Sequence, residues 1–382
     1  MSELSAAFSQ RFGQNPTLFR APGRINLIGE HIDYHDGLVM PAAIHFQINF
    51  AVAPVAEGGT AGTLVAADLN EEVPYDLTQL APGDVAWANY LLGVMAQLKQ
   101  AGAEFPAVNV AFGGDIPPGA GLSSSAALEC GLALALNDLF GLGLDRMQLA
   151  LLSQRAEQTF AGVQCGLMDQ FASLFGKTGQ VVRLDCRSHE YAYFPFPSDG
   201  WCLVLMDTQV KHALSDGGYN QRHEESMAGL RAIQARYPNV KSLREVSDAQ
   251  LTSCQTEMSE VSHRRCRYVL DEIRRVVEAG KALQAGNLAH LGELMYATHH
   301  GLQHDYEVSC PELDYLVQVS RDLDAVVGAR MMGGGFGGCT LNLVPLGQEE
   351  AVGKQLSAAF EAEFGHSPGV YLTQISAGAS RA

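Results

Sequence analysis

The residue types that could do chemistry are densest between Pro117 and Ala127, where the sequence reads Pro-Pro-Gly-Ala-Gly-Leu-Ser-Ser-Ser-Ala-Ala. Glycines let a backbone approach a polyanion closely, and serines supply hydroxyl groups and a cap for a helix that we expect to start near Ala126. First-turn amides and the positive end of a helix dipole favour bound phosphate. The stretch therefore predicts a phosphate-binding loop made by Gly119, Ala120, Gly121, Leu122, Ser123, Ser124 and Ser125.

This loop is not a Walker A motif, because no lysine occurs in it. The charge of a triphosphate would then be neutralised by a metal ion and by residues elsewhere in the chain. A proline-glycine turn that leads into a serine-capped buried helix is the structural alternative, and the stretch alone does not decide between the two.

Two further motifs lie on either side of this loop in the sequence. Residues 22–34 read Pro-Gly-Arg-Ile-Asn-Leu-Ile-Gly-Glu-His-Ile-Asp-Tyr, and residues 331–339 read Met-Met-Gly-Gly-Gly-Phe-Gly-Gly-Cys. Together the three motifs resemble the signatures of the GHMP small-molecule kinases. The Gly-Glu-His-x-Asp-Tyr core of the first is similar to the galactokinase signature, and the resemblance covers nearly the whole chain.

The resemblance to galactokinases implies ATP-dependent phosphorylation of the anomeric hydroxyl of α-D-galactose. It implies that Asp169 accepts the proton of that hydroxyl and that Arg24 lies beside it and stabilises negative charge. Phosphoryl transfer passes through a loose transition state, so positioning would supply most of the rate. Without the resemblance, an aspartate at a helix start would be interpreted as a first-turn charge.

The same resemblance implies the remaining site residues. Sugar recognition needs fixed hydrogen-bonding groups, since a site built around particular hydroxyls rejects analogues that lack them. The implied sugar-binding residues are Glu30, His31, Ile32, Asp33, Gly166 and Tyr219. Mg²⁺ is implied at Ser125 and Glu157, and Trp87 is implied beside the adenine, whereas Tyr90 is equally well explained as a packing aromatic.

The elements that must position these residues follow from hydrophobic periodicity and turn signals. A strand over 17–21 is expected to run into the first motif, where Pro22 and Gly23 turn the chain and place Arg24 on a loop. A strand over 108–112 leads to the phosphate loop. The following helix, 126–140, is apolar nearly all round and so buried. Asp145 is expected to cap the next helix, through Phe160.

The length of 382 residues predicts two domains. The resemblance implies an α+β architecture with an N-terminal mixed-sheet domain, like domain 2 of ribosomal protein S5, over 1–190. It implies a C-terminal ferredoxin-like domain over 191–382 and an active site between the two. Further strands are expected over 38–40, 46–53, 63–67, 181–185, 191–196, 202–207, 330–332, 340–344 and 369–376.

Composition limits the partners. A net charge of −17 argues against general binding to nucleic acid or anionic membranes, which needs a basic surface. The eight cysteines are scattered without Cys-x-x-Cys pairs, as in reduced cytoplasmic proteins. Neither a signal peptide nor a membrane span is evident. We therefore expect a cytoplasmic protein with a small-molecule substrate, and the family's tendency is a monomer.

Three alternatives remain open from the sequence. A related sugar kinase acting on N-acetylgalactosamine, arabinose or galacturonate would share these motifs, and His35 and Ile32 stand where many relatives have asparagine and threonine. A galactose sensor without catalysis is disfavoured because the serine run 123–125 is uninterrupted and Arg24 and Asp169 are present. A mevalonate or homoserine kinase does not explain the Glu-His-x-Asp-Tyr core.

Overall fold

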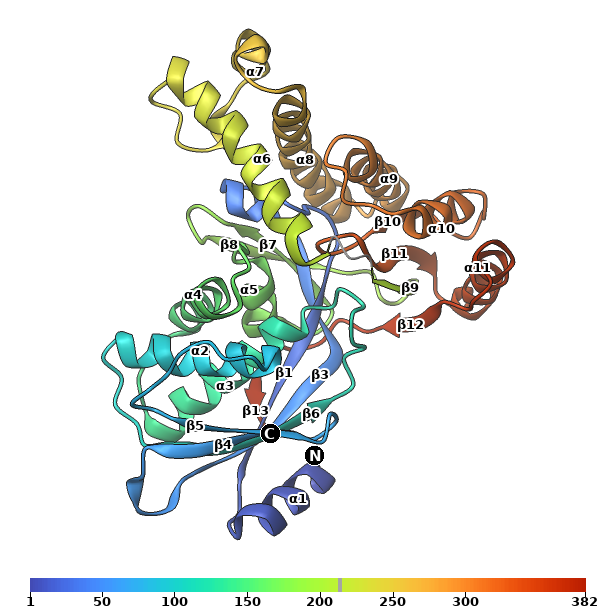
Figure 1. Ribbon diagram of the computed structural model, residues 1–382. Helices are drawn as coiled ribbons and strands as arrows, with labels where there is room; N and C mark the ends of the chain where they lie inside the picture. Colours follow the sequence, from blue (N-terminus) through green and yellow to red (C-terminus); the bar gives the residue numbers. More distant parts are fainter. Residues whose placement is uncertain (212–214) are drawn as a thin grey trace.

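The computed structural model describes residues 1–211 and 215–382, and a mixed six-stranded sheet forms its N-terminal part (Figure 1). The strand order is β13-β1-β3-β6-β4-β5, antiparallel except for the parallel pair β4 and β6. The bounds of these strands are β1 Thr17–Asn26, β3 Pro41–Pro54, β4 Ala61–Ala66, β5 Glu71–Asp76, β6 Val108–Gly114 and β13 Ser380–Arg381.

Helices cover both faces of this sheet because its strands are apolar on both sides. Phe50 and Val52 belong to the large core under four helices, whereas the alternate residues Ala51 and Ala53 pack against Phe8 of α1 on the other face. The bounds of these helices are α1 Ser2–Phe12, α2 Ala86–Gln100, α3 Ser124–Phe140, α4 Arg146–Ala156 and α5 Met168–Phe175.

The C-terminal part contains a four-stranded antiparallel sheet in the order β10-β11-β9-β12. Its strands are β9 Trp201–Lys211, β10 Gly328–Met331, β11 Gly337–Pro345 and β12 Gly369–Thr373. Its helices are α6 Ser215–Arg236, α7 Asp248–Ser253, α8 Glu260–Gln284, α9 Leu288–His304, α10 Pro311–Arg321 and α11 Glu349–Phe364. The β-α-β-β-α-β succession and the strand order are those of a ferredoxin-like fold, which confirms the expected fold class.

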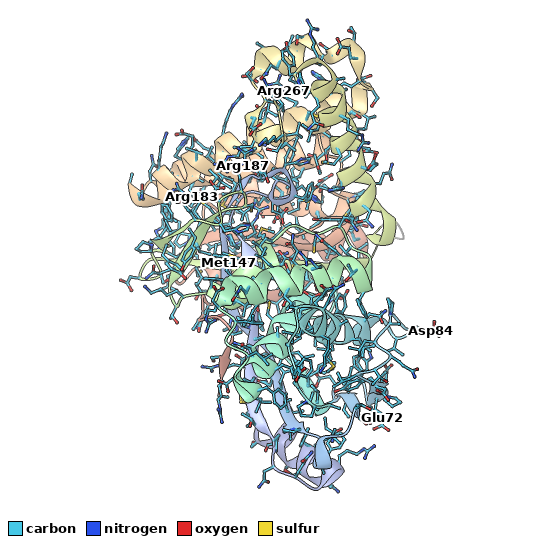
Figure 2. The ribbon with its side chains drawn as sticks, turned by 90° about the vertical axis from the view of Figure 1, so that its left-hand side faces the viewer. Glu72, Asp84, Met147, Arg183, Arg187 and Arg267 are labelled. Atoms are coloured by element: carbon cyan, nitrogen blue, oxygen red, sulfur yellow. The ribbon has the colours of Figure 1, made fainter. Side chains whose placement is uncertain are left out.

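A small third sheet joins the two parts, in the order β2-β7-β8. Its strands are β2 Leu38–Val39, β7 Gln180–Asp185 and β8 Tyr191–Pro195. Figure 2 shows Arg183 and Arg187 in this region, with Glu72 and Asp84 lying toward one end of the molecule and Arg267 toward the other. Among the described residues, no helix has both the length and the apolar character needed to cross a bilayer.

Two strands were not expected from the sequence, β5 and β13. The chain end returns to the N-terminal sheet, where Arg381 in β13 lies opposite Phe19 in β1. Figure 1 shows both chain ends near this edge of the molecule. The division of the chain at 190 and 191 remains a prediction.

The expectation that Pro22 and Gly23 turn the chain was wrong, because β1 continues through them to Asn26 with a register shift. Arg24 therefore lies within a strand. A Cβ atom at Gly23 would lie 2.6 Å from the carbonyl oxygen of Leu122, and the Arg24 amide donates to that oxygen over 3.0 Å. Gly23 thus allows the phosphate loop to pack directly on β1.

Helix α3 begins at Ser124, slightly earlier than the expected start near Ala126. Asp145 caps α4 as predicted, and its carboxylate and the side chain of Gln148 form a reciprocal capping box. Beyond Ala156 the helix continues as a π-helical turn over Glu157–Ala161. Such turns are frequent at functional sites.

Candidate active site

Arg24 and Asp169 form a bidentate ion pair at the centre of the site. The Nε atom of Arg24 donates to Oδ1 of Asp169 over 2.8 Å, and Nη2 donates to Oδ2 over 2.9 Å. The remaining Nη1 donates to the carbonyl oxygen of Gly121 over 2.6 Å. Strand β1 and the first turn of α5 position the two groups, and Arg24 is only 4% exposed. The pair is therefore fixed in orientation and attached to the phosphate loop.

Ser123 adds a second link between this pair and the phosphate loop. Its hydroxyl donates to Oδ2 of Asp169 over 2.5 Å, and its backbone is left-handed with φ of 58°. Ser123 occupies the N-cap position of α3, yet its side chain makes no capping hydrogen bond. The Ser123 hydroxyl therefore leaves the first-turn amides of α3 unoccupied. A helix start that binds phosphate needs these amides for the ligand.

Glu30 connects the first motif with the glycine loop, which we define as residues 333–338. Its Oε1 atom accepts from the Gly333 amide over 2.8 Å and from Nη2 of the fully buried Arg330 over 3.0 Å. In the part of the chain that the structure describes, Oε2 of Glu30 has no hydrogen-bond partner. That oxygen remains for a ligand hydroxyl.

His31 has both ring nitrogens engaged by the protein. Nδ1 lies 2.9 Å from the Tyr34 hydroxyl, and Nε2 lies 3.2 Å from the carbonyl oxygen of Gly334. Burial lowers the pKa of His31 to about 4, so the ring is neutral at pH 7. The ring of Tyr219, from α6, lies 5.2 Å away between centroids.

Asp33 lies directly against Gly166. A Cβ atom at Gly166 would lie 2.1 Å from Oδ2 of Asp33, so only glycine admits this carboxylate. Burial, followed by the charges of Asp169 and Glu30, raises the pKa of Asp33 to about 7. The neighbouring Ile32 is fully buried in the core, and its side chain does not line the pocket.

These groups border one cavity of about 90 Å³. Eight of the residues implied from the sequence line it: Arg24, Glu30, His31, Asp33, Glu157, Gly166, Asp169 and Tyr219. Gly333 and Gly334 of the third motif also line it, as do three residues that the sequence did not assign to the site: Val163, Cys165 and Met168. The cavity thus combines carboxylates, a guanidinium and an aromatic ring, which is a lining suited to a small polyhydroxylated ligand.

The glycine loop lies against the phosphate loop. A Cβ atom at Gly333 would lie 3.2 Å from the carbonyl oxygen of Gly121, and one at Gly338 would lie 3.4 Å from Ala120. Both glycines have positive φ, of 83° and 81°. Since L side chains rarely adopt this conformation, the close contact between the two loops depends on glycine here.

Glu157 is the carboxylate that the sequence predicts as a metal ligand. Burial, followed by the charge of Asp169, raises the pKa of Glu157 to about 7, and its interaction with Ser125 opposes that shift. Carboxylate and hydroxyl oxygens are the ligands that Mg²⁺ prefers, so this donor set fits the ion. Within 1–211 and 215–382, no group of three or more His, Cys, Asp or Glu residues could hold a metal.

Trp87 lies at the start of α2, outside the cavity lining. Its indole nitrogen donates to Oε2 of Glu71 over 2.7 Å, and its ring meets Phe112 edge-on at 5.3 Å. Tyr90, one turn later, packs against the core. The structure therefore accounts for Trp87 by its hydrogen bond to β5, and its place beside adenine stays a prediction.

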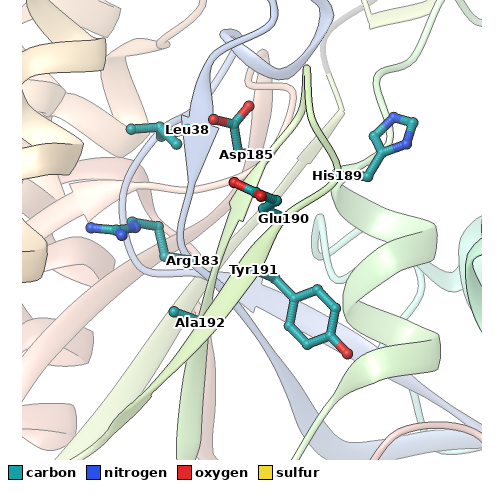
Figure 3. Close-up of a pocket in the computed structure, with 7 residues that line it drawn as sticks. All are labelled: Leu38, Arg183, Asp185, His189, Glu190, Tyr191 and Ala192. Carbon is teal, nitrogen blue, oxygen red and sulfur yellow. The ribbon is translucent and has the colours of Figure 1, made fainter.

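A larger cavity, of about 490 Å³, lies around the β7–β8 turn and shares no lining residue with the site (Figure 3). Its lining includes Arg183, Glu190 and Asp185, and Asp185 is already paired with Arg244 through contacts of 2.5 and 2.7 Å. Figure 3 shows these side chains spread around the hairpin, with Tyr191 and Arg183 well separated. We assign it no part in the chemistry.

Comparison with known proteins agrees with this geometry. The family described as GHMP kinases N terminal domain matches residues 89–177, the galactokinase galactose-binding signature matches 6–54, and GHMP kinases C terminal matches 279–362. A galactokinase of Roseiflexus sp. is 40% identical over 380 residues, which are 99% of this chain and 96% of that protein. The chain belongs to the galactokinase family of GHMP kinases. A galactokinase of Thermosipho africanus is 36% identical over 95% of this chain and 99% of its own length.

Solved structures place the galactokinase-family fold over the whole chain. The crystal structure of Lactococcus lactis galactokinase complexed with galactose superposes with a TM-score of 0.95 at 35% identity, covering 100% of this chain and 99% of that one. A mevalonate kinase of Methanococcus jannaschii, at 17% identity and a TM-score of 0.64, shares the fold alone. The resemblance and the fold class inferred from the sequence are confirmed.

Three residues that support the site were not assigned to it from the sequence, and two of them, Arg330 and Gln170, are fully buried. Arg330 holds Glu30, Gln170 donates to Glu157 over 2.7 Å, and Tyr34 contacts His31. Each stands inside or directly beside a motif, since Gln170 follows Asp169, Tyr34 ends the first motif and Arg330 precedes the third. Their adjacency to motif residues was the available signal.

Proposed function

We propose that this protein transfers the γ-phosphoryl group of ATP to the anomeric hydroxyl of α-D-galactose, giving α-D-galactose 1-phosphate and ADP. The observation that carries the proposal is the attachment of the Arg24–Asp169 pair to the phosphate loop through Gly121 and Ser123. A kinase must bring the group that orients its nucleophile next to the triphosphate. Here one aspartate borders both the phosphate loop and the cavity.

Asp169 accepts the proton of the sugar hydroxyl as the oxygen–phosphorus bond forms and the bond to the leaving ADP oxygen breaks. The proton passes from Asp169 to solvent after the transfer. Arg24 keeps the carboxylate oriented through two hydrogen bonds and places positive charge beside the reacting oxygen. Because the transition state is loose, orientation of the hydroxyl contributes more than its full deprotonation.

Mg²⁺ held by Ser125 and Glu157 would neutralise charge on the phosphates. The residues fit that role because a buried carboxylate with a raised pKa lies beside a hydroxyl at the start of α3. The buried Gln170 amide donates to Oε2 of Glu157 over 2.7 Å and holds that carboxylate in place. Glu157 thus lines the cavity as a carboxylate of fixed orientation, and a bound cation would favour its ionised form.

Galactose is the sugar that the site supports. Glu30 offers Oε2, Asp33 offers a carboxylate held against Gly166, and Tyr219 supplies an aromatic wall. Glu30 and Asp33 lie within residues 6–54, which match the galactokinase galactose-binding signature, whereas Gly166 and Tyr219 lie outside that range. The Lactococcus lactis relative, which shares 35% of its sequence with this chain, has been solved with galactose.

The proposal is tested by ADP release from Mg-ATP with galactose, 2-deoxygalactose, N-acetylgalactosamine, glucose, arabinose and galacturonate, and with galactose in EDTA. We expect strong turnover on galactose that EDTA abolishes and little turnover on glucose. Preference for another sugar of the panel would retain the reaction and overturn the substrate. Galactose binding without ADP release would overturn catalysis.

A further inference from the structure

The two ring nitrogens of His31 have partners of different kinds, and this determines where the ring proton lies. The partner of Nε2 is the carbonyl oxygen of Gly334, which can only accept, so Nε2 carries the proton. In the neutral ring Nδ1 must then accept, and its partner is the Tyr34 hydroxyl at 2.9 Å. Tyr34 therefore donates to His31.

The same reasoning extends to the next hydroxyl. The Tyr34 and Tyr306 oxygens lie 2.8 Å apart, and either could donate on distance alone. The proton of Tyr34 is already directed at His31, so the 2.8 Å contact takes its proton from Tyr306, for which the Ser226 Oγ atom, 3.4 Å away, is the more distant acceptor. The hydrogen bonds thus run in one direction, from Tyr306 through Tyr34 and His31 to Gly334.

This series of hydrogen bonds ends at Gly334 of the glycine loop. The neighbouring residue, Gly333, is also held by the first motif. Gly333 donates its amide to Glu30, and Gly334 accepts from His31, so adjacent residues are held by adjacent residues of the first motif. The loop also contacts Tyr219, because a Cβ atom at Gly334 would lie 3.4 Å from that ring. The His31 ring is therefore one of the attachments that hold the loop where Gly333 and Gly334 line the sugar cavity.

We propose that Tyr34 is a positioning residue that fixes the Nε2-protonated tautomer of His31, so that the His31 ring holds the glycine loop at Gly334 over the sugar cavity. His31 then serves the site as a support of that loop, since neither ring nitrogen is left for a sugar hydroxyl. Tyr306 orients the Tyr34 hydroxyl but is not needed for the donation to Nδ1. Because the hydrogen bonds run from Tyr306 to Tyr34 to His31, loss of the Tyr34 hydroxyl should disturb His31 more than loss of the Tyr306 hydroxyl.

The first test is spectroscopic and does not depend on the proposed function. Protein labelled with ¹⁵N-histidine is compared by long-range proton–nitrogen correlation as wild type, Tyr34→Phe and Tyr306→Phe, with His31→Gln identifying the His31 signals. We expect the Nε2-protonated pattern for His31 in wild type and Tyr306→Phe. Tyr34→Phe is expected to shift Nδ1 to its unbonded position or to mix the tautomers. Protonation at Nδ1 in wild type would overturn the proposal.

The second test is kinetic and rests on the proposed galactose kinase activity. Leaving Nδ1 buried without a donor is expected to raise the KM for galactose about tenfold in Tyr34→Phe, with kcat and the KM for ATP changed less. Tyr306→Phe is expected to stay within about threefold of wild type because Tyr34 still donates. Equal effects of the two substitutions would overturn the assigned direction.

Tyr296→Phe provides the matched control. The Tyr296 hydroxyl is buried and has no hydrogen-bond partner among the residues that the structure describes, so its removal tests the loss of a buried hydroxyl alone. It should leave both the His31 signals and the kinetics unchanged. If Tyr34→Phe lowers the melting temperature but keeps the His31 pattern and the galactose KM of wild type, Tyr34 is a packing residue and the proposal fails.

Discussion

The Arg24 guanidinium and the Asp169 carboxylate form two parallel hydrogen bonds across 145 positions of the chain. Strand β1 and helix α5 bring them together, and the Ser173 hydroxyl of α5 donates to the carbonyl oxygen of Pro22 in β1 over 2.9 Å. Because this contact fixes the two elements independently of the ion pair, conservative substitutions in the pair test chemistry more than folding.

Asp169→Asn is expected to lower kcat by roughly 10²–10⁴, the usual contribution of a positioned proton acceptor. The asparagine oxygen can still accept from Arg24 or Ser123, so the fold and the KM for galactose should change much less. Steady-state ADP release and a thermal melt measure both effects. Near-full turnover by the variant would remove Asp169 from the mechanism.

A remote arginine–aspartate pair, also joined by two hydrogen bonds, supplies the control for that experiment. Asp185 accepts two hydrogen bonds from Arg244 and lies outside the site. Asp185→Asn should lower the melting temperature, because a partly buried guanidinium loses its anionic partner, and should leave kcat unchanged. A comparable loss of kcat in both variants would show that the effect at Asp169 comes from lost stability.

Gly23→Ala is expected to separate the phosphate loop from β1. The new methyl group would lie 2.6 Å from the carbonyl oxygen of Leu122, which is backbone and cannot rotate away. We expect the KM for ATP to rise about tenfold or more, with a smaller change for galactose, and a loss of stability of about 1–3 kcal/mol. Initial rates at varied ATP and a denaturant titration measure these effects.

Gly200→Ala is the matched control, since a Cβ atom at Gly200 would meet no described residue within 4 Å and its φ is not in the left-handed region. Its kinetics and stability should match wild type. If Gly23→Ala also matches wild type for both substrates, the contact between β1 and the phosphate loop is not what sets the affinity for ATP.

The fold and the three motifs could be predicted because each rests on local pattern. Alternating apolar residues predicted β3, and the glycine and serine run predicted the start of α3. A strand of two residues such as β13 carries no periodicity, so its pairing with β1 depends on tertiary contact alone. The bulge at Gly23 was missed because a Pro-Gly pair is also a turn signal. The strand continues here because the Leu122 carbonyl oxygen packs against Gly23 and accepts from the Arg24 amide, a contact that the local sequence does not show.

The supporting residues of the site could not be predicted for a related reason. Arg330 is fully buried and donates to Glu30, which lies 300 positions away, and its place directly before the third motif does not identify that partner. The pairing of Tyr34 with Tyr306 likewise joins motif and helix end over 272 positions. Long-range partners of this kind become visible only when the fold brings the segments together.

Asp33→Asn is expected to stabilise the ligand-free protein at pH 8. Burial raises the pKa of Asp33 to about 7 in the folded state, above its ordinary value in the unfolded chain. The folded state therefore binds more protons between these values, and its stability falls as pH rises toward 7 and then levels. Removing the charge should raise the free energy of unfolding by about 1–3 kcal/mol at pH 8 and change it little at pH 4.

Melting temperatures of wild type and Asp33→Asn across this pH range measure the effect, and the stabilisation by added galactose reports binding. We expect Asp33→Asn to melt at a higher temperature than wild type at pH 8 without sugar. We also expect added galactose no longer to raise its melting temperature. Asp36→Asn is the control, because Asp36 is paired with Arg187 at the surface and its removal should not stabilise the protein. Equal pH profiles for wild type and Asp33→Asn would refute the buried carboxylate argument.

Glu157→Gln is expected to raise the Mg²⁺ concentration needed for half-maximal rate by about tenfold or more, since a carboxylate ligand is replaced by a neutral amide. Turnover at saturating Mg²⁺ should recover in part, while the KM for galactose should change little. ADP release at fixed ATP over a Mg²⁺ titration measures this directly. An unchanged Mg²⁺ requirement would place the ion elsewhere.

Glu129→Gln separates metal binding from the buried hydrogen bonds nearby. Gln170 donates to both Glu129 and Glu157, so either substitution disturbs the same amide. Burial raises the pKa of Glu129 well above its usual range, which favours the neutral acid, and glutamine is a neutral replacement of similar shape. We therefore expect Glu129→Gln to keep the Mg²⁺ requirement of wild type. A tenfold rise in both variants would show that Gln170, rather than the charge of Glu157, controls metal affinity.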